Sequence, residues 1–272
     1  MKLAEIEQKD KAIQESIEYA QRIQLALLPS DAELEAQLPN GFVLYMPCAV
    51  VSGDFYYYAR PEEAVHLVAI GDATGHGVPG AFMSLIGLTL LNEVSNHTPL
   101  DQPQKILEAI DLRLHHLLHE KSSASATTRV WDTIDLALVI VDEKKHKIRF
   151  CGAKLRLYQL TSDNQVNVYK GTARSLGEAR TQVPFVVHEL PFEKDYRYYL
   201  LTDGLVDQFG YARSKSGEEE IRKFMSRRLK ALLLDIAGQP PLQQKAAIQW
   251  TIEAWRRDIE QIDDICIVGF GR

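Results

Sequence analysis

Residues 71–84 read Gly-Asp-Ala-Thr-Gly-His-Gly-Val-Pro-Gly-Ala-Phe-Met-Ser, and they connect a predicted strand to a predicted helix. The apolar run at 64–70 indicates the strand, and the apolar run at 84–94 indicates the helix. The glycines between them let the backbone turn and approach a ligand closely. Asp72 therefore ends a strand beside exposed carbonyl groups, where a carboxylate suits a hard cation. The alternative is a tight turn with a solvated aspartate.

The composition is that of a globular protein, with 272 residues, 46% hydrophobic residues and a formal net charge of −6 at pH 7. This charge gives no indication of nucleic-acid binding. Cys48, Cys151 and Cys266 are too few and too widely spaced for a disulfide framework, and they fit a reducing compartment. No apolar run reaches about 18 residues, and the N-terminus lacks a signal-peptide pattern. We therefore expect a cytoplasmic protein without membrane insertion.

The N-terminal segment, residues 3–28, predicts one helix that ends before a proline. Its apolar residues recur at seven-residue steps, at Ile6, Ile13, Ala20 and Leu27. Asp10 and Gln24 interrupt the apolar seam, so the pattern is that of an imperfect coiled coil. We expect residues 1–28 to form a linker or dimerisation helix, and residues 29–272 to form the main domain. An amphipathic helix that packs on its own domain is the alternative.

The rest of the chain alternates between groups of strands and groups of helices. Short apolar or aromatic runs predict strands at 42–45, 54–59, 65–70, 133–141, 147–151, 155–160, 166–169, 186–190, 197–201 and 265–270. Helical patterns cover 85–94, 106–119, 218–236 and 242–259, and a polar stretch at 121–130 predicts a flexible loop. This order of elements predicts an α+β fold with antiparallel sheets rather than repeated βαβ units.

Acidic residues stand at the ends of several predicted strands, namely Asp54, Asp72, Asp203 and the doublet Asp263-Asp264. Their shared position suggests that they converge at one rim of the sheets. Clustered carboxylates repel one another and raise their own pKa values. Divalent cations relieve that repulsion, and carboxylates with water suit Mg²⁺ or Mn²⁺. Two such ions can clamp a phosphoryl group.

Several motifs also follow one another in the order of a known family. They lie at residues 52–56, 71–84, 135–138, 201–204, 206–210 and 263–264, preceded by a helix and turn at 21–30. Over about residues 20–270 the chain resembles the SpoIIE/RsbU-like bacterial serine phosphatases, a branch of the metal-dependent PPM phosphatases. The string at 71–84, in order with the other motifs, is highly specific, whereas one Asp-Gly pair alone is weak.

The resemblance implies a fold of two stacked antiparallel β-sheets flanked by helices, an αββα sandwich, over residues 29–272. It also implies that the chain hydrolyses phosphoserine or phosphothreonine with two Mn²⁺ or Mg²⁺ ions. By analogy, the catalytic and metal-binding groups are the carboxylates of Asp54, Asp72, Asp203 and Asp263 and the carbonyl of Ala73. Asp72 would bridge both ions, and Asp54 would act through water. Asp264 is the alternative to Asp263, because the doublet can be aligned either way.

The chain departs from the family pattern at two places. Lys154 stands where relatives often carry Asn or His, and an ammonium group cannot bind a third metal ion. Residues 42–51 contain no Arg or Lys, so the phosphate-binding arginine of eukaryotic relatives has no counterpart there. We expect Lys154 and His76 to contact substrate, although a solvated lysine and a structural histidine are the alternatives. Asp135 matches a family motif but is interpreted as a packing or capping residue.

The family analogy also indicates partners. It implies a phosphorylated STAS-domain protein, such as an anti-sigma-factor antagonist, as substrate, and an upstream sensor or regulatory protein. The seven-residue apolar pattern itself predicts a homodimer formed by residues 3–28. The basic segment 222–230 predicts either a docking helix for an acidic partner or a solvated helix face. Two other functions stay open, a catalytically weak binding module and a small-molecule phosphohydrolase. An open cleft at the sheet end would favour a protein substrate, and a closed pocket would favour a metabolite.

Overall fold

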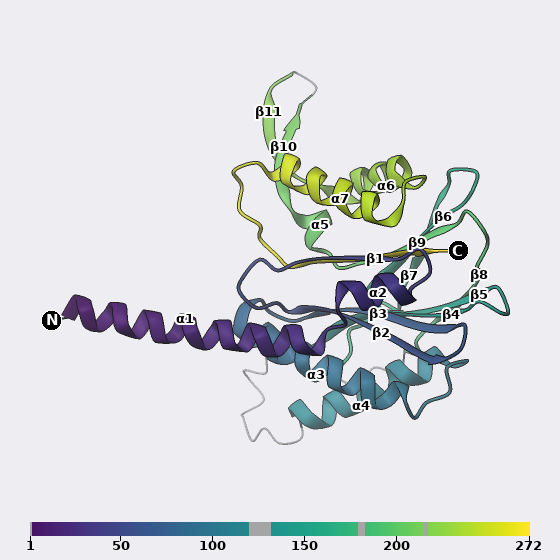
Figure 1. The fold of residues 1–272 in the computed structure, drawn as a ribbon, viewed down its shortest axis with the longest axis horizontal. Helices are drawn as coiled ribbons and strands as arrows, with labels where there is room; N and C mark the ends of the chain where they lie inside the picture. The colour runs from purple at the N-terminus through teal and green to yellow at the C-terminus, as the bar shows by residue number, and fades with distance from the viewer. Residues whose placement is uncertain (1, 120–131, 179–182, 215–216) are drawn as a thin grey trace.

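Two five-stranded antiparallel sheets are stacked face to face between two pairs of helices (Figure 1). This computed structural model describes residues 2–119, 132–178, 183–214 and 217–272. One sheet has the strand order β2 (Asp54–Glu62), β3 (Val65–Ala73), β4 (Ile134–Asp142), β5 (Lys147–Ala153) and β8 (Val187–Pro191). The other has the order β1 (Phe42–Met46), β12 (Ile265–Gly271), β9 (Arg197–Leu201), β6 (Arg156–Leu160) and β7 (Val166–Lys170). The predicted αββα sandwich is confirmed.

Helices cover the outer face of each sheet. The first sheet carries α3 (Gly77–Ser95) and α4 (Pro103–His119), and the second carries α6 (Met225–Ile236) and α7 (Pro241–Arg256). The strands β3 and β4 are almost wholly buried, because the other sheet covers one face and α3 and α4 cover the other. Their sequences are accordingly apolar runs rather than strict alternations. A second apolar cluster joins α6 and α7 to β1, β9 and β12.

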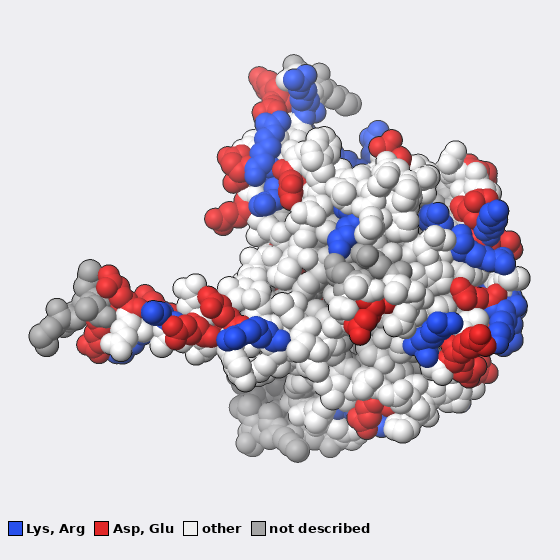
Figure 2. Space-filling view, in the orientation of Figure 1, with Lys and Arg blue, Asp and Glu red and all other residues white. Residues whose placement is uncertain are grey.

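The N-terminal helix α1 (Lys2–Leu27) projects from the sandwich (Figure 1), and acidic and basic side chains are interspersed along it (Figure 2). Two residues of the seven-residue pattern, Ile6 and Ile13, are 56% and 59% exposed. The last turns, by contrast, pack against the body through Gln24, which is only 2% exposed. The Gln24 amide nitrogen donates to the Ser52 carbonyl at 2.6 Å and to Ser84 Oγ at 2.8 Å. The Gln24 amide oxygen accepts the Ser52 N–H at 3.1 Å. Gln24 therefore attaches α1 to the main domain rather than merely interrupting a seam.

The prediction of a helix over 218–236 is wrong in its first third. Residues Glu219–Lys223 form the strand β11, which pairs with β10 (Phe209–Arg213) in a two-stranded hairpin. The helix α6 begins only at Met225, which has a φ of 67°. The basic segment is thus divided between a strand and a helix, because cross-strand pairing overrides local helix propensity. Two short helices, α2 (Asp31–Gln37) and α5 (Gly204–Asp207), complete the described elements. The predicted loop at 121–130 lies outside the described residues.

Within the described part of the chain, α3 alone is long and apolar enough to cross a membrane. Half of that stretch is buried inside the protein. Its buried side chains include Met83, Leu88 and Leu91, which belong to the main core. These are the properties of a core helix in a sandwich.

Candidate active site

Three neighbouring strands place an aspartate at the same end of the first sheet. Asp54 of β2 lies opposite Asp72 of β3, and Asp72 lies opposite Asp135 of β4. Residues directly opposite in antiparallel strands present their side chains on the same face. The pairing of β2, β3 and β4 therefore produces a row of carboxylates. Asp135, interpreted from sequence as a packing or capping residue, belongs to this row.

The second sheet contributes its aspartates at the adjoining end. Asp203 lies two residues after the end of β9, and Asp263 and Asp264 precede β12, the antiparallel neighbour of β9. A cavity of about 280 Å³ lies between the two sheet ends. It is lined by Asp72, Ala73, Thr74, Gly75, His76, Thr133, Asp135, Lys154, Asp203 and Asp263. Most of the predicted site residues thus meet around one space.

The glycine-rich turn after β3 is shaped by close backbone contacts. Gly75 and Gly77 have φ values of 89° and 65°, in the left-handed region that glycine adopts without strain. A Cβ atom on Gly80 would lie 2.1 Å from the Gly75 carbonyl oxygen. The turn therefore folds back on the first turn of α3, which leaves His76 exposed at the cavity.

The two members of the Asp263-Asp264 doublet have different surroundings. Asp264 is 2% exposed, and its carboxylate accepts the backbone N–H groups of Cys48 at 2.7 Å and Gly53 at 2.8 Å. Asp263 lines the cavity, and among the described residues its carboxylate accepts one hydrogen bond, from the Asp264 N–H at 2.9 Å. The geometry therefore favours Asp263 as the cavity-facing group, while Asp264 holds the loop that leads into β2.

Asp54 lies behind the cavity rather than in its lining. It is 2% exposed, and one carboxylate oxygen accepts the Thr202 hydroxyl at 2.6 Å. Burial and the nearby charge of Asp72 raise the pKa of Asp54, and the Thr202 hydrogen bond opposes that rise. This location fits an indirect role through water better than direct contact with a ligand in the cavity.

Burial and mutual repulsion both act on the carboxylates around the cavity. Burial, followed by the charges of Asp203, Asp135 and Asp263, raises the pKa of Asp72 to about 8. Burial, followed by the charge of Asp263, raises the pKa of Asp203 as well. No three His, Cys, Asp or Glu side chains among the described residues are already grouped around one ion position. The donor set itself, hard oxygen atoms with unneutralised charge, is the type that binds Mg²⁺ or Mn²⁺.

Lys154 partly offsets this charge. It lies in the turn between β5 and β6 with a φ of 58°. Its ammonium nitrogen is 3.6 Å from carboxylate oxygens of both Asp135 and Glu178. Asp135 also accepts a hydrogen bond from the Ser175 hydroxyl. Lys154 is thus positioned at the cavity, as the sequence predicted, with two ion-pair partners that the sequence did not indicate.

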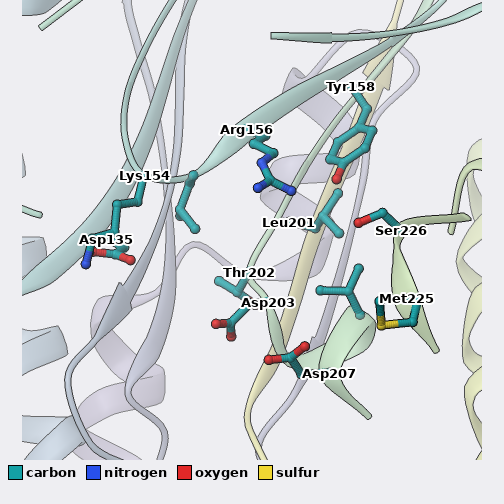
Figure 3. Close-up of a pocket in the computed structure, with 12 residues that line it drawn as sticks. Asp135, Lys154, Arg156, Tyr158, Leu201, Thr202, Asp203, Asp207, Met225 and Ser226 are labelled. Carbon is teal, nitrogen blue, oxygen red and sulfur yellow. The ribbon is translucent and has the colours of Figure 1, made fainter. Parts of the chain in front are cut away.

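A second cavity of about 330 Å³ adjoins the first and shares Asp135, Lys154 and Asp203 with it (Figure 3). It continues along β6 past Arg156. Its far side is lined by Tyr158, Leu201, Val206, Asp207, Met225 and Ser226. Sequence reasoning missed Arg156, because nothing in the local pattern around β6 distinguishes it from an ordinary surface arginine.

Comparisons with known proteins identify the family. The family model described as Stage II sporulation protein E (SpoIIE) matches residues 62–272. The SiaA-PP2C domain of Pseudomonas aeruginosa is 32% identical, with a TM-score of 0.83 and coverage of 97% of this chain and 98% of that one. A structure of the PP2C phosphatase domain of SpoIIE from Bacillus subtilis, with a fragment of its regulatory domain, is 16% identical and shares the fold. Its TM-score is 0.64, over 84% of this chain and 60% of that one.

One curated relative matches over a shorter stretch. Phosphoserine phosphatase RsbP of Bacillus subtilis is 26% identical over 164 residues, or 60% of this chain. The match spans 38% of the length of RsbP. The family model alone covers more than half of this chain, and the SiaA domain aligns over nearly all of it. The chain therefore belongs to the SpoIIE family, within the PPM-type serine phosphatases.

Proposed function

We propose that this chain removes phosphate from phosphoserine or phosphothreonine of a partner protein, with two Mn²⁺ or Mg²⁺ ions as cofactors. The observation that carries the proposal is the convergence of Asp72, Asp135, Asp203 and Asp263 on one cavity between the sheet ends. Burial, followed by the charges of the neighbouring carboxylates, raises the pKa of Asp72, and divalent cations would relieve both the burial cost and the repulsion. Because these carboxylates are not yet grouped around an ion, binding would draw them together.

The carboxylates at and behind the cavity divide into two roles. Asp72, Asp203 and Asp263, with the carbonyl of Ala73, would hold the ions. When bound, such ions neutralise phosphoryl charge and activate water for in-line attack. Asp54 would orient water from behind the cavity, since its carboxylate is buried and accepts the Thr202 hydroxyl.

Two groups in the cavity lining are suited to contact the substrate phosphate. Lys154 has an ammonium group at the mouth, shared between two carboxylates at 3.6 Å, and it can exchange one of them for a phosphate oxygen. His76 is exposed beside Asp263 and is suited to donate a proton to the departing serine oxygen.

The openness of the site favours a protein substrate over a metabolite. Asp203, His76 and Lys154 are exposed, so a phosphorylated side chain on a folded protein can reach the carboxylates. Sites for small molecules usually bury most of their ligand instead. RsbP is named a phosphoserine phosphatase, and another structure of this fold contains the RsbU and RsbW domains of Rv1364c from Mycobacterium tuberculosis. We propose a phosphorylated STAS-domain protein as the substrate.

Regulation would act through α1. The exposed apolar residues Ile6, Ile13 and Tyr19 suit a homodimer formed by residues 3–28. Gln24 connects this helix to Ser52, two residues before Asp54. A movement of α1 imposed by an upstream sensor would therefore be transmitted to the carboxylate row. Light scattering on the full chain and on a chain without residues 3–28 tests the dimer, and a monomeric full chain would contradict it.

The proposed activity is tested with a phosphorylated STAS-domain protein and with 4-nitrophenyl phosphate. Phosphate release should require Mn²⁺ or Mg²⁺ and should stop on addition of EDTA. Asp203→Asn should abolish turnover while leaving the circular dichroism spectrum unchanged, because the variant removes one ligand of the pair of ions. Turnover that persists in EDTA, or near wild-type turnover by Asp203→Asn in Mn²⁺, would contradict the proposal.

A further inference from the structure

We propose that Arg156, Met225 and Arg227 form a docking surface for the substrate segment beside the phosphorylated residue, and that this surface selects an acidic side chain in that segment. We call these three residues the docking surface. The inference rests on the proposed phosphatase function and adds to it the sequence that the site prefers. The docking surface also supplies positive charge beside the site, which residues 42–51 lack.

Strand pairing places Arg156 next to the carboxylate cluster. Arg156 begins β6 and lies opposite Leu201, the last residue of β9. Asp203 follows Leu201 by two residues, and Lys154 precedes Arg156 by two. Figure 3 shows the Arg156 guanidinium group pointing into the cavity of about 330 Å³ that adjoins the carboxylates. A peptide whose phosphate occupies the carboxylate cavity would therefore pass close to Arg156.

Arg156 differs from the cations around it because its charge is free. It is exposed, and within the described residues it has no hydrogen bond or ion pair with another side chain. Lys154 is shared between two carboxylates, and Lys223 lies 3.2 Å from the Asp207 carboxylate. Arg222 is paired with Glu220. An unpaired guanidinium beside the site is suited to a bidentate interaction with a carboxylate of the substrate.

Met225 extends this surface away from the cluster. It is 55% exposed, although it is apolar, and it lines both the cavity with Arg156 and a neighbouring groove. That groove contains Arg227, which is exposed and also has no ion pair among the described residues. The docking surface therefore combines an apolar side chain with two positive charges that are unpaired among the described residues, one in each of the two spaces that Met225 lines. Its charge complements an acidic segment, and exposed charges of this kind favour specificity.

The location of Arg156 separates docking from phosphate binding. Arg156 does not line the cavity that contains Asp72 and Asp263, whereas Lys154 lines both cavities. Removal of the Arg156 charge should therefore affect substrates with acidic flanks and should spare small phosphate esters.

The test compares phosphoserine peptides flanked by Glu, Ala or Lys with 4-nitrophenyl phosphate, all in Mn²⁺. Arg156→Gln should raise KM about three- to tenfold for the Glu-flanked peptide, with kcat unchanged, because it removes one partly exposed charged contact. The other substrates should be unaffected. Arg156→Glu should reverse the preference toward the Lys-flanked peptide. The control is Lys147→Gln, which also removes one positive charge. Lys147 begins β5, at the end of the strand away from Lys154, and pairs with Glu189. This variant should leave KM and kcat unchanged for every substrate.

Two results would overturn the docking surface while leaving the proposed activity intact. One is an unchanged preference for Glu-flanked peptide in both Arg156 variants. The other is an equal loss on every substrate, which would place Arg156 in phosphate binding or in the metal site. A wild-type protein that hydrolyses none of these substrates would instead contradict the proposed function. In that case, fluorescence anisotropy with labelled versions of the same peptides measures binding alone. Weaker binding of the Glu-flanked peptide to Arg156→Gln supports the docking surface, and unchanged binding contradicts it.

Discussion

Replacing Asp72 by asparagine removes a negative charge from the carboxylate cluster and preserves the shape of the side chain. Asp72 is the member of the row that lies opposite both Asp54 and Asp135. Its loss should have two consequences of opposite sign. Activity in Mn²⁺ should fall by at least about a hundredfold, because a ligand of the proposed ions is gone. The metal-free protein should become more stable, because the variant removes a charge that is buried and repelled by its neighbours.

The stability gain should depend on pH in a defined direction. The pKa of Asp72 is raised from 3.8 to about 8, so between these values the folded chain holds a proton that the unfolded chain releases. The free energy of unfolding of the metal-free wild type therefore falls as pH rises from about 4 to about 8. At about 1.4 kcal/mol per pKa unit, the full shift would lower the free energy of unfolding by about 6 kcal/mol. Residual contact with solvent reduces this, and we expect about 2 kcal/mol at pH 8.

The assay is thermal unfolding in EDTA, followed by circular dichroism at pH 5 and pH 8. Asp72→Asn should raise the Tm by about 4–8 °C at pH 8, and the difference from wild type should shrink toward zero near pH 4. Added Mn²⁺ should reverse the order, because it stabilises the wild type more than the variant.

Asp142→Asn is the control, and we expect it to change the Tm in the opposite direction from Asp72→Asn. Burial tends to raise the pKa of Asp142, but hydrogen bonds from the backbone and ammonium group of Lys145 outweigh it and lower the pKa. A depressed pKa stabilises the fold above the unfolded value and loses that effect in acid. Asp142→Asn should therefore lower the Tm at pH 8. A Tm difference for Asp72→Asn that is the same at pH 5 and pH 8 would refute the electrostatic reasoning.

Two further variants test the groups that border the cluster. Lys154→Asn should raise KM for phosphoprotein if the ammonium group leaves Asp135 and Glu178 to contact the phosphate; an unchanged KM would confine Lys154 to its ion pairs. Gln24→Ala removes three buried hydrogen bonds that connect α1 to Ser52 and Ser84. The free energy of unfolding, measured by urea denaturation, should therefore fall by about 2–3 kcal/mol. The Gln24 variant should also lose kcat, and full kcat together with reduced stability would show that the contact is structural only.

Local patterns in the sequence determined much of the fold. Apolar runs located strands such as Arg197–Leu201 with the bounds that the structure has, because burial on both faces leaves a continuous signal along the chain. The same patterns located Asp54, Asp72 and Asp203 beside strand ends. Their roles as metal ligands remain predictions. The sequence could not separate Asp263 from Asp264, because neighbouring residues share every local feature except the direction of the side chain.

Tertiary structure decided which of these residues act together. The Asp264 carboxylate is occupied by the N–H of Gly53, 211 residues away in the sequence, and this contact leaves Asp263 at the cavity. The pairing of β4 with β3 brings Asp135 into the carboxylate row, and the pairing of β6 with β9 brings Arg156 beside the site. The β10–β11 hairpin likewise overrode a helical pattern. Periodicity reports how each segment is buried, whereas register and opposing neighbours depend on contacts between segments far apart, which no local pattern encodes.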